Sequence, residues 1–289
     1  MFPILLNGEG RLRSGWKVLA FLLALSAANG LAYLLLVKVL DLGTLVRGPA
    51  GELVPTLLLV AVSWTALRME GGSLKSLGLG LDRRWALELV LGLLAGGALI
   101  ILAASLLRAL GGFTWVSNPL ANARTLLGGC WVFLFVAINE EATFRGYPFQ
   151  RLVEGLGPWG AQAIFAGFFA LVHWGNSGIR DANLPLKAVT TINIALAAIL
   201  LGLAFLRTRS LALPIGIHWA WNWTQGNLLG FPVSGTGDPI APFKPLLTAR
   251  PHWLTGGAVG LEGSVACTLV CLGFILVLFF WRGSAPREA

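Results

Sequence analysis

Long apolar stretches separated by short polar connections constrain this chain more than any other feature. A helix that crosses the bilayer core needs about 20 mainly apolar residues. An ordinary soluble domain carries roughly 25% charged residues, whereas here 12% of the residues are charged and 56% are hydrophobic. These values exclude a soluble globular enzyme and predict an all-α polytopic membrane protein, a bundle of about eight transmembrane helices. The stretches lie at residues 16–38, 53–68, 85–109, 125–149, 158–175, 188–206, 210–230 and 264–281.

The chain, residues 1–289, is expected to form a single integral-membrane domain, because the spans leave no room for a separate soluble one. Its basic first segment leads into an apolar stretch that is too long for a signal-peptide core, and we interpret that stretch as the first span. With the N-terminus inside, 13 of the 21 Lys and Arg residues fall in inner segments and 8 in outer ones. This bias predicts a multi-pass protein of the cell membrane with both termini in the cytoplasm.

The net charge of +8 is spread over the short connections and forms no basic run, which argues against a nucleic-acid site. The three cysteines all lie inside apolar stretches, where cysteine acts as a small hydrophobic residue. They indicate neither a disulfide framework nor a Cys-rich zinc site.

Ionisable side chains inside a membrane span are costly and indicate function by default. Of the thirteen acidic residues, only Glu88, Glu140 and Glu141 fall within the predicted helices. Glu88 lies one turn after Trp85, which favours a structural or topological role. Arg145 follows Glu141 by four residues, a spacing that brings two side chains together on one helix face. The alternative ends the helix early and makes this segment a solvated, salt-bridged turn at the membrane surface.

Two further spans carry polar groups. His173 ends the fifth apolar stretch, where a lone histidine is more often a hydrogen-bonded packing residue than a catalyst. His218 and Asn222 are four residues apart in the seventh stretch, so both can donate hydrogen bonds toward one point, as an oxyanion site requires. The alternative for this pair is polar contact between helices. Trp219, beside His218, is expected to form part of a cavity wall.

Three spans thus each carry polar groups that are expensive in lipid, and these groups can be satisfied only if they face one another around an intramembrane polar cavity. A carboxylate, two imidazoles and an amide can activate water and stabilise a tetrahedral oxyanion. This set indicates peptide hydrolysis. A proton-coupled transporter, which uses the same residue types as a relay, and a non-catalytic immunity or partner protein are the alternatives.

The three segments resemble the motifs of a known family. Glu140-Glu141-Ala-Thr-Phe-Arg145, Phe169-Ala-Leu-Val-His173 and His218-Trp-Ala-Trp-Asn222 are similar to the EExxxR, FxxxH and HxxxN/D motifs of the CPBP family, which contains type II CAAX prenyl proteases and the bacteriocin-related Abi proteins. The resemblance covers a motif-bearing core at about residues 125–230. The motifs occur in the family's order and lie in separate spans.

The resemblance implies an intramembrane endopeptidase whose cavity opens to the cytosol and to lipid. By that resemblance Glu140 is the base that activates water, His173 helps to position the water, and His218 and Asn222 stabilise the oxyanion. Glu141 and Arg145 then support the site, and Phe169 joins Trp219 in the substrate cavity. The expected substrate is a membrane-associated peptide or protein, of CAAX type and prenylated or of bacteriocin type.

Other protease classes fit less well. Ser177, in a rhomboid-like GxSG, is followed by a polar loop, whereas the rhomboid serine begins an apolar helix. The chain has no HExxH zinc motif. Zinc nevertheless stays a candidate cofactor, because Glu140, Glu141, His173 and His218 could supply two or three ligands and leave one position for water. A glutamate that activates water without a metal fits the same residues.

Overall fold

The computed structural model describes residues 4–44 and 49–284. Eight helices of twelve or more residues occur in this part of the chain, one at each predicted span, and the structure confirms the all-α class. They are α1 (Ser14–Tyr33), α3 (Leu53–Met69), α4 (Arg83–Ala109), α5 (Ala123–Phe144), α6 (Tyr147–Val172), α8 (Leu184–Thr208), α9 (Ala212–Trp223) and α11 (Val265–Phe280).

Four helical segments are long and apolar enough to cross a membrane: Ser14–Val39, Arg83–Ala109, Ala123–Gly175 and Leu184–Thr208. The helices α3 and α11 are apolar but shorter. The helix α9 has twelve residues, continues as a π-helical turn (Thr224–Leu228), and is buried along nearly its whole length. It is therefore the central helix of the bundle and has little lipid-facing surface.

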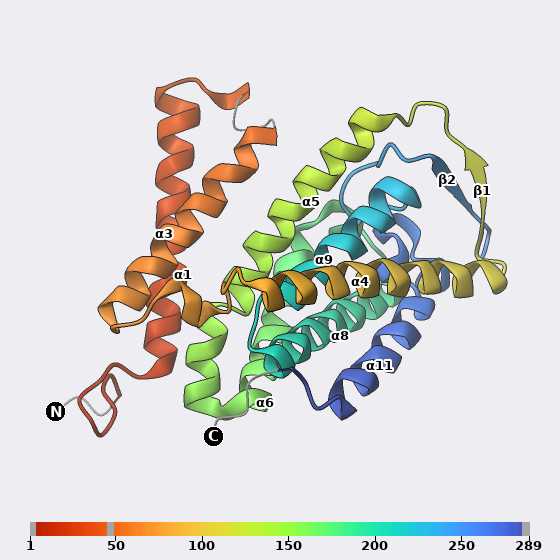
Figure 1. The fold of residues 1–289 in the computed structure, drawn as a ribbon. Helices are drawn as coiled ribbons and strands as arrows, with labels where there is room; N and C mark the ends of the chain where they lie inside the picture. The colour runs from red at the N-terminus through yellow and green to blue at the C-terminus, as the bar shows by residue number, and fades with distance from the viewer. Residues whose placement is uncertain (1–3, 45–48, 285–289) are drawn as a thin grey trace.

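Figure 1 shows α1 and α3 side by side at one edge of the molecule, with α5 next to them. The helices α4, α8 and α11 run together at a steep angle to that pair, and α9 lies against both α4 and α5. Two short strands, β1 (Phe113–Ser117) and β2 (Phe243–Leu247), form an antiparallel ribbon beyond the end of α4. The short helices α7 (Ser177–Arg180) and α10 (His252–Thr255) lie in the connections.

The backbones of α4 and α9 touch directly. A Cβ atom built on Gly96 would lie 2.1 Å from the carbonyl oxygen of Ile217, and one built on Gly92 would lie 2.5 Å from that of Leu213. These two glycines, four residues apart, form the small-xxx-small spacing that lets membrane helices approach closely. The contact fixes the position of α9, which carries His218 and Asn222.

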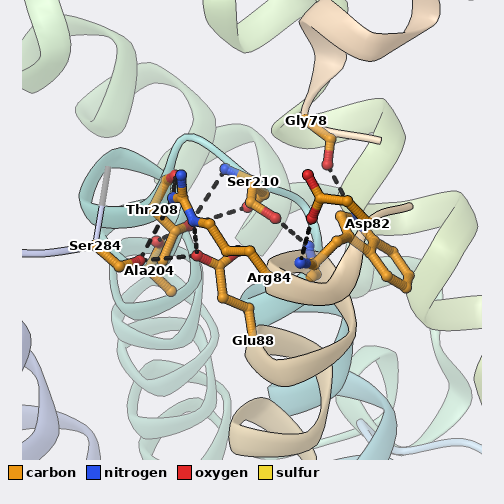
Figure 2. A network of polar contacts seen from close by, with 10 residues as sticks. Gly78, Asp82, Arg84, Glu88, Ala204, Thr208, Ser210 and Ser284 are labelled. Atoms are coloured by element: carbon orange, nitrogen blue, oxygen red, sulfur yellow. Dashed lines mark hydrogen bonds and ion pairs between the residues drawn. The ribbon is translucent and has the colours of Figure 1, made fainter. Parts of the chain in front are cut away.

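Contacts near the chain termini and the path of the helices define two opposite faces of the bundle. On the terminal face, Lys17 at the start of α1 and Arg151 in α6 both pair with Glu70 after α3. On the same face Ser284, near the C-terminus, donates a hydrogen bond to Glu88 at the start of α4 (Figure 2). The opposite face carries the β1–β2 ribbon and the connections that follow α6 and α9. We name these the terminal face and the ribbon face.

The fourth and fifth helices differ from their predicted bounds. The helix α5 ends at Phe144 and not near residue 149, and α6 begins at Tyr147 with Pro148 in its first turn. Proline has no N–H to donate to the carbonyl oxygen four residues earlier and its ring clashes with that carbonyl, so a helix cannot continue from Phe144 through Pro148, whereas proline is tolerated in the first turn of a new helix. Gly157, with φ at 72°, then breaks α6 just before Pro158, where the fifth span was predicted to begin.

Candidate active site

One cavity of about 540 Å³ brings together the polar residues of three helices. It is lined by Glu140 of α5, by His173 at the end of α6, and by His218 and Asn222 of α9. The rest of its wall comes from α5 and from residues 233–239 of the long connection after α9. These lining segments place the cavity toward the ribbon face of the bundle.

Glu141 and Arg145 lie behind this cavity and are fully buried, at 0% and 2% exposure. Glu141 Oε1 is 3.2 Å from Arg145 Nη1 and 2.8 Å from His218 Nδ1. Arg145 Nη2 also donates to the carbonyl oxygen of Ala198 in α8, at 2.9 Å. The alternative of a solvated turn for this segment is therefore wrong, because the ion pair lies inside the bundle and orients His218.

The contact with Glu141 fixes how His218 presents its other nitrogen. A carboxylate held by Arg145 only accepts hydrogen bonds, so Nδ1 of His218 carries a proton. The opposite nitrogen, Nε2, lies 3.8 Å from Oε2 of Glu140. It can donate into the cavity only when the ring carries both protons.

His173 is fixed in the same manner by Phe169. Its Nδ1 lies 2.7 Å from the carbonyl oxygen of Phe169, an atom that only accepts, so Nδ1 is the donor. In the neutral ring Nε2 is then an acceptor. The Phe169 ring lies 4.5 Å from the His173 ring and 6.5 Å from the His218 ring, and the guanidinium of Arg145 stands over it at 5.1 Å. Phe169 thus sits between the buried ion pair and the two histidines.

Asn222 is 5% exposed, and its side-chain amide has no hydrogen-bond partner among the described residues.

Trp219 is placed differently from its prediction as a cavity wall. It does not line the cavity. Its indole N–H donates to the carbonyl oxygen of Cys130 in α5, at 3.0 Å. Trp223, one turn later, donates to Leu126 of the same helix. These two tryptophans join α9 to α5.

Residues 122–224, which contain every one of these polar groups, match a family described as Type II CAAX prenyl endopeptidase Rce1-like. This segment is therefore similar to an Rce1-like domain. The match confirms the resemblance that the three motifs indicate, and it places the segment in a family of peptide hydrolases. Comparison with curated proteins and with solved structures finds no match.

Glu262, outside the Rce1-like segment, holds the connection that completes the cavity wall, and the motifs gave no sign of it. Its Oε2 accepts hydrogen bonds from the backbone N–H and the hydroxyl of Ser234. Its Oε1 accepts from the indole of Trp221 in α9, at 3.2 Å. Asn176, which follows His173, donates to the carbonyl oxygen of Ser234 at 2.8 Å. Only the charge of Glu262 within a proline-rich connection could have drawn attention to it.

The predicted metal candidates do not assemble into a zinc ligand set. In residues 4–44 and 49–284 no three His, Cys, Asp or Glu side chains are grouped so that they could hold a metal ion. Glu141 Oε1 is already engaged by Arg145 and His218, and Nδ1 of His173 is engaged by a backbone carbonyl. A catalytic zinc takes three protein ligands and one water. These side chains do not fit such a site.

Proposed function

We propose that this protein is an intramembrane endopeptidase that hydrolyses a peptide bond of a membrane-associated substrate with water activated by Glu140. The observation that carries the proposal is the convergence of Glu140, His173, His218 and Asn222 on one cavity inside a membrane bundle. The match to a family of peptide hydrolases supports the same reaction.

In the first step Glu140 takes a proton from water while the water oxygen attacks the peptide carbonyl carbon. His173 holds that water in place, because its Nδ1–H is bound to the backbone and its Nε2 is left to accept the second water hydrogen. Two acceptors on one water orient its lone pair toward the substrate. Glu140 then delivers the proton to the leaving amine as the tetrahedral intermediate collapses.

The negative charge that develops on the carbonyl oxygen needs hydrogen-bond donors. The Asn222 amide supplies one, and it is free to do so because it has no partner among the described residues. His218 supplies the other from Nε2 when its ring carries both protons. The Glu141–Arg145 pair fixes the orientation of that ring, since Nδ1 of His218 is tied to the buried carboxylate. Donors that are oriented before reaction cost no reorganisation in the transition state.

The cavity and the chain termini lie on opposite faces of the bundle. The location of the termini therefore determines the side of the membrane from which a substrate enters. The cavity is lined by residues 233–239 on the ribbon face, whereas Lys17 and Ser284 lie on the terminal face. Cytoplasmic termini and a cytosolic cavity therefore exclude each other. The distribution of Lys and Arg favours cytoplasmic termini, and we propose this arrangement, with the cavity opening on the outer face.

Thiol labelling of intact cells tests the orientation. In a variant without Cys130, a membrane-impermeant reagent is expected to label Thr236→Cys and to leave Ser284→Cys unlabelled until the cells are opened. Labelling of Ser284→Cys alone would reverse the orientation and establish the cytosolic cavity that the family resemblance implies. The buried Cys267 and Cys271 serve as an internal control.

The reaction is tested with the purified protein in detergent and two fluorogenic peptides, a prenylated CAAX-type peptide and its unprenylated counterpart. Cleavage of either is expected for the wild type, and Glu140→Gln should abolish it, because the amide keeps the side-chain shape but cannot take a proton. Glu154→Gln, at an exposed glutamate on the terminal face, is the matched control. A transporter or a non-catalytic partner protein would cleave neither peptide, and near-normal turnover of Glu140→Gln would exclude Glu140 as the base.

A further inference from the structure

The connection after α9 forms a tight turn at residues 233–236. The backbone N–H of Thr236 donates to the carbonyl oxygen of Val233 at 2.8 Å, and the N–H of Val233 donates back to Thr236 at 3.4 Å. The two central residues, Ser234 and Gly235, have φ values of 48° and 74°. Positive φ at both central positions is the geometry of a type I′ turn. The turn directly precedes residues that line the cavity containing Glu140.

Both central residues of the turn are bound to other parts of the protein. Glu262 accepts hydrogen bonds from the backbone N–H and the hydroxyl of Ser234. The N–H of Gly235 donates to the carbonyl oxygen of Val259, and the carbonyl oxygen of Gly235 accepts from the N–H of Gly178 in α7, both at 3.0 Å. A Cβ atom built on Gly178 would lie 2.8 Å from Cα of Gly235, so the two backbones are in direct contact. These contacts fix the position of the residues that follow the turn.

Gly237 and Asp238 follow the turn and line the cavity. Within the part of the chain that the structure describes, their backbone N–H and carbonyl groups have no hydrogen-bond partner. Since glycine has no side chain, Gly237 borders the cavity with its backbone. A Cβ atom built on Gly237 would meet no atom within 4 Å, and φ there is +67°. Unpaired backbone groups are thus open to a molecule in the cavity.

Pro239 restricts the backbone of Asp238. A proline disfavours helical geometry in the residue before it and favours an extended backbone there. In an antiparallel pair of extended chains, the N–H and the carbonyl oxygen of one residue exchange two hydrogen bonds with a single residue of the neighbouring chain. Asp238 can therefore bind one residue of a second extended chain through both of its backbone groups.

The wall that α5 contributes has no such capacity. It includes Val132, Phe133, Val136 and Glu140. The backbone N–H and carbonyl groups inside an α-helix bond to one another. A peptide in the cavity therefore meets apolar side chains and a carboxylate on α5, and it finds free backbone partners at residues 237–238.

A membrane-associated substrate needs such partners when it is cleaved. In a helical substrate the carbonyl oxygen of the scissile bond is paired within the helix, and the helix shields the carbonyl carbon from water. Unwinding exposes that carbon but leaves backbone groups unpaired, which is costly at membrane depth. Hydrogen bonds to residues 237–238 offset this cost for the unwound segment.

We propose that the backbone groups of Gly237 and Asp238 bind the main chain of the peptide substrate beside the scissile bond, so that the site takes its substrate as an unwound, extended segment. The inference rests on the proposed function. Main-chain hydrogen bonds of this kind give affinity for an extended peptide, whereas side-chain pockets give sequence specificity. The contact therefore selects the conformation of the substrate.

Exchange of single amide bonds of the peptide for esters tests the proposal. An ester keeps the shape of the peptide but has no N–H, so it loses a hydrogen bond to a carbonyl oxygen of the connection. Binding of a fluorescent peptide and its ester analogues, one at each position outside the scissile bond, is measured by fluorescence anisotropy on full-length Glu140→Gln in detergent. We expect the ester at one position to bind about two- to tenfold more weakly, the effect of one neutral hydrogen bond. Equal binding of all the analogues would overturn the proposal.

A proline substitution locates the contact. Asp238→Pro removes one N–H that lines the cavity, and Ile240→Pro, the matched control, removes an unpaired N–H at an exposed residue of the same connection that does not line it. We expect Asp238→Pro to bind the unmodified peptide about two- to tenfold more weakly and Ile240→Pro to bind it normally, with folding checked by thermal melting. Equal binding by two folded variants would refute the assignment.

Asp238→Asn separates the backbone from the side chain, because it keeps both backbone groups and removes the charge. It should lose less affinity than Asp238→Pro, and an equal loss would show that the carboxylate makes the contact and that the proposal is wrong. If Asp238→Pro does not fold, the ester series decides, since it changes only the peptide.

Turnover of the same peptides by the wild type distinguishes this inference from the proposed function. We expect the weakly bound ester to raise KM and to leave kcat little changed. Cleavage of every analogue with the same KM would defeat the backbone contact alone. If the ester weakens binding but the wild type cleaves no peptide, the proposed hydrolysis is wrong and the backbone contact stands.

Discussion

The contact between α4 and α9 predicts that one methyl group added to α4 slows the proposed hydrolysis. In Gly96→Ala the new Cβ atom would lie 2.1 Å from the carbonyl oxygen of Ile217 and 2.8 Å from its Cα. Ordinary van der Waals contact begins at 3.4 Å. Because both groups are backbone, α9 must retreat from α4 by about 1 Å, since no side chain can rotate away from the clash.

The displacement of α9 also moves the site residues, because Ile217 precedes His218 and Asn222 lies one turn further along the same helix. A misplacement of about 1 Å in catalytic groups can lower turnover by about 10²-fold. We therefore expect Gly96→Ala to cleave peptide about 10²-fold more slowly than the wild type, with an overpacking cost of about 1–3 kcal/mol in stability.

Gly97→Ala is the control. A Cβ atom there would meet only Thr224 Oγ1 at 3.6 Å, an ordinary contact, so it adds the same methyl group to the same helix without displacing α9. Turnover and thermal melting are measured on both variants in the same detergent. Wild-type turnover in a folded Gly96→Ala protein would refute the reasoning that α4 sets the position of His218.

Three further predictions follow from the site and from the terminal face. Asn222→Ala should lower turnover by about 10²–10³-fold with substrate binding little changed, the effect of removing one oxyanion donor. Because these side chains do not fit a zinc site, His218→Ala should lower turnover and leave the metal content of the purified protein unchanged, and a joint loss of bound zinc and activity would contradict this. Burial alone would raise the pKa of Glu70. Hydrogen bonds from Lys17 and Tyr147 and the charge of Arg151 together lower the pKa by more than burial raises it, so it lies below its ordinary value of 4.5. The stability that the Glu70 carboxylate contributes is thus present above that value and is lost as the pH falls through the lowered one, so Glu70→Gln should flatten the melting profile on acidification.

Hydropathy alone located the eight helices, because burial in lipid demands long apolar runs. The ends of the helices depended on backbone chemistry that hydropathy ignores. Pro148 and the Gly157-Pro158 pair are visible in the sequence and could have placed the breaks at Phe144 and within α6. The spacing of Gly92 and Gly96 was equally visible, but the sequence does not say which helix they would meet.

The polar site was predictable at the level of residue types, since Glu140, His173 and His218 are too costly to face lipid. The contacts among the site residues were harder to predict from the sequence. The spacing of Glu141 and Arg145 indicated their pairing, but the contact of Glu141 with His218 joins residues 77 positions apart. That Trp219 bonds to α5 and does not line the cavity depends on the rotation of α9, which is set by its packing against α4 and α5.

The buried ion pair also has a consequence for the biogenesis of this protein. Arg145, directly after α5, contacts the backbone of α8 and the ring of Phe169 in α6, and through Glu141 it holds His218 of α9. These four helices are synthesised in the order α5, α6, α8 and α9, so α9 is the last of them to enter the membrane. A partly inserted chain therefore has no oriented His218 and, by the proposed mechanism, could not hydrolyse a peptide. The proposed mechanism thus predicts that nascent chains do not cleave their neighbours, because the candidate site forms only with the completed bundle.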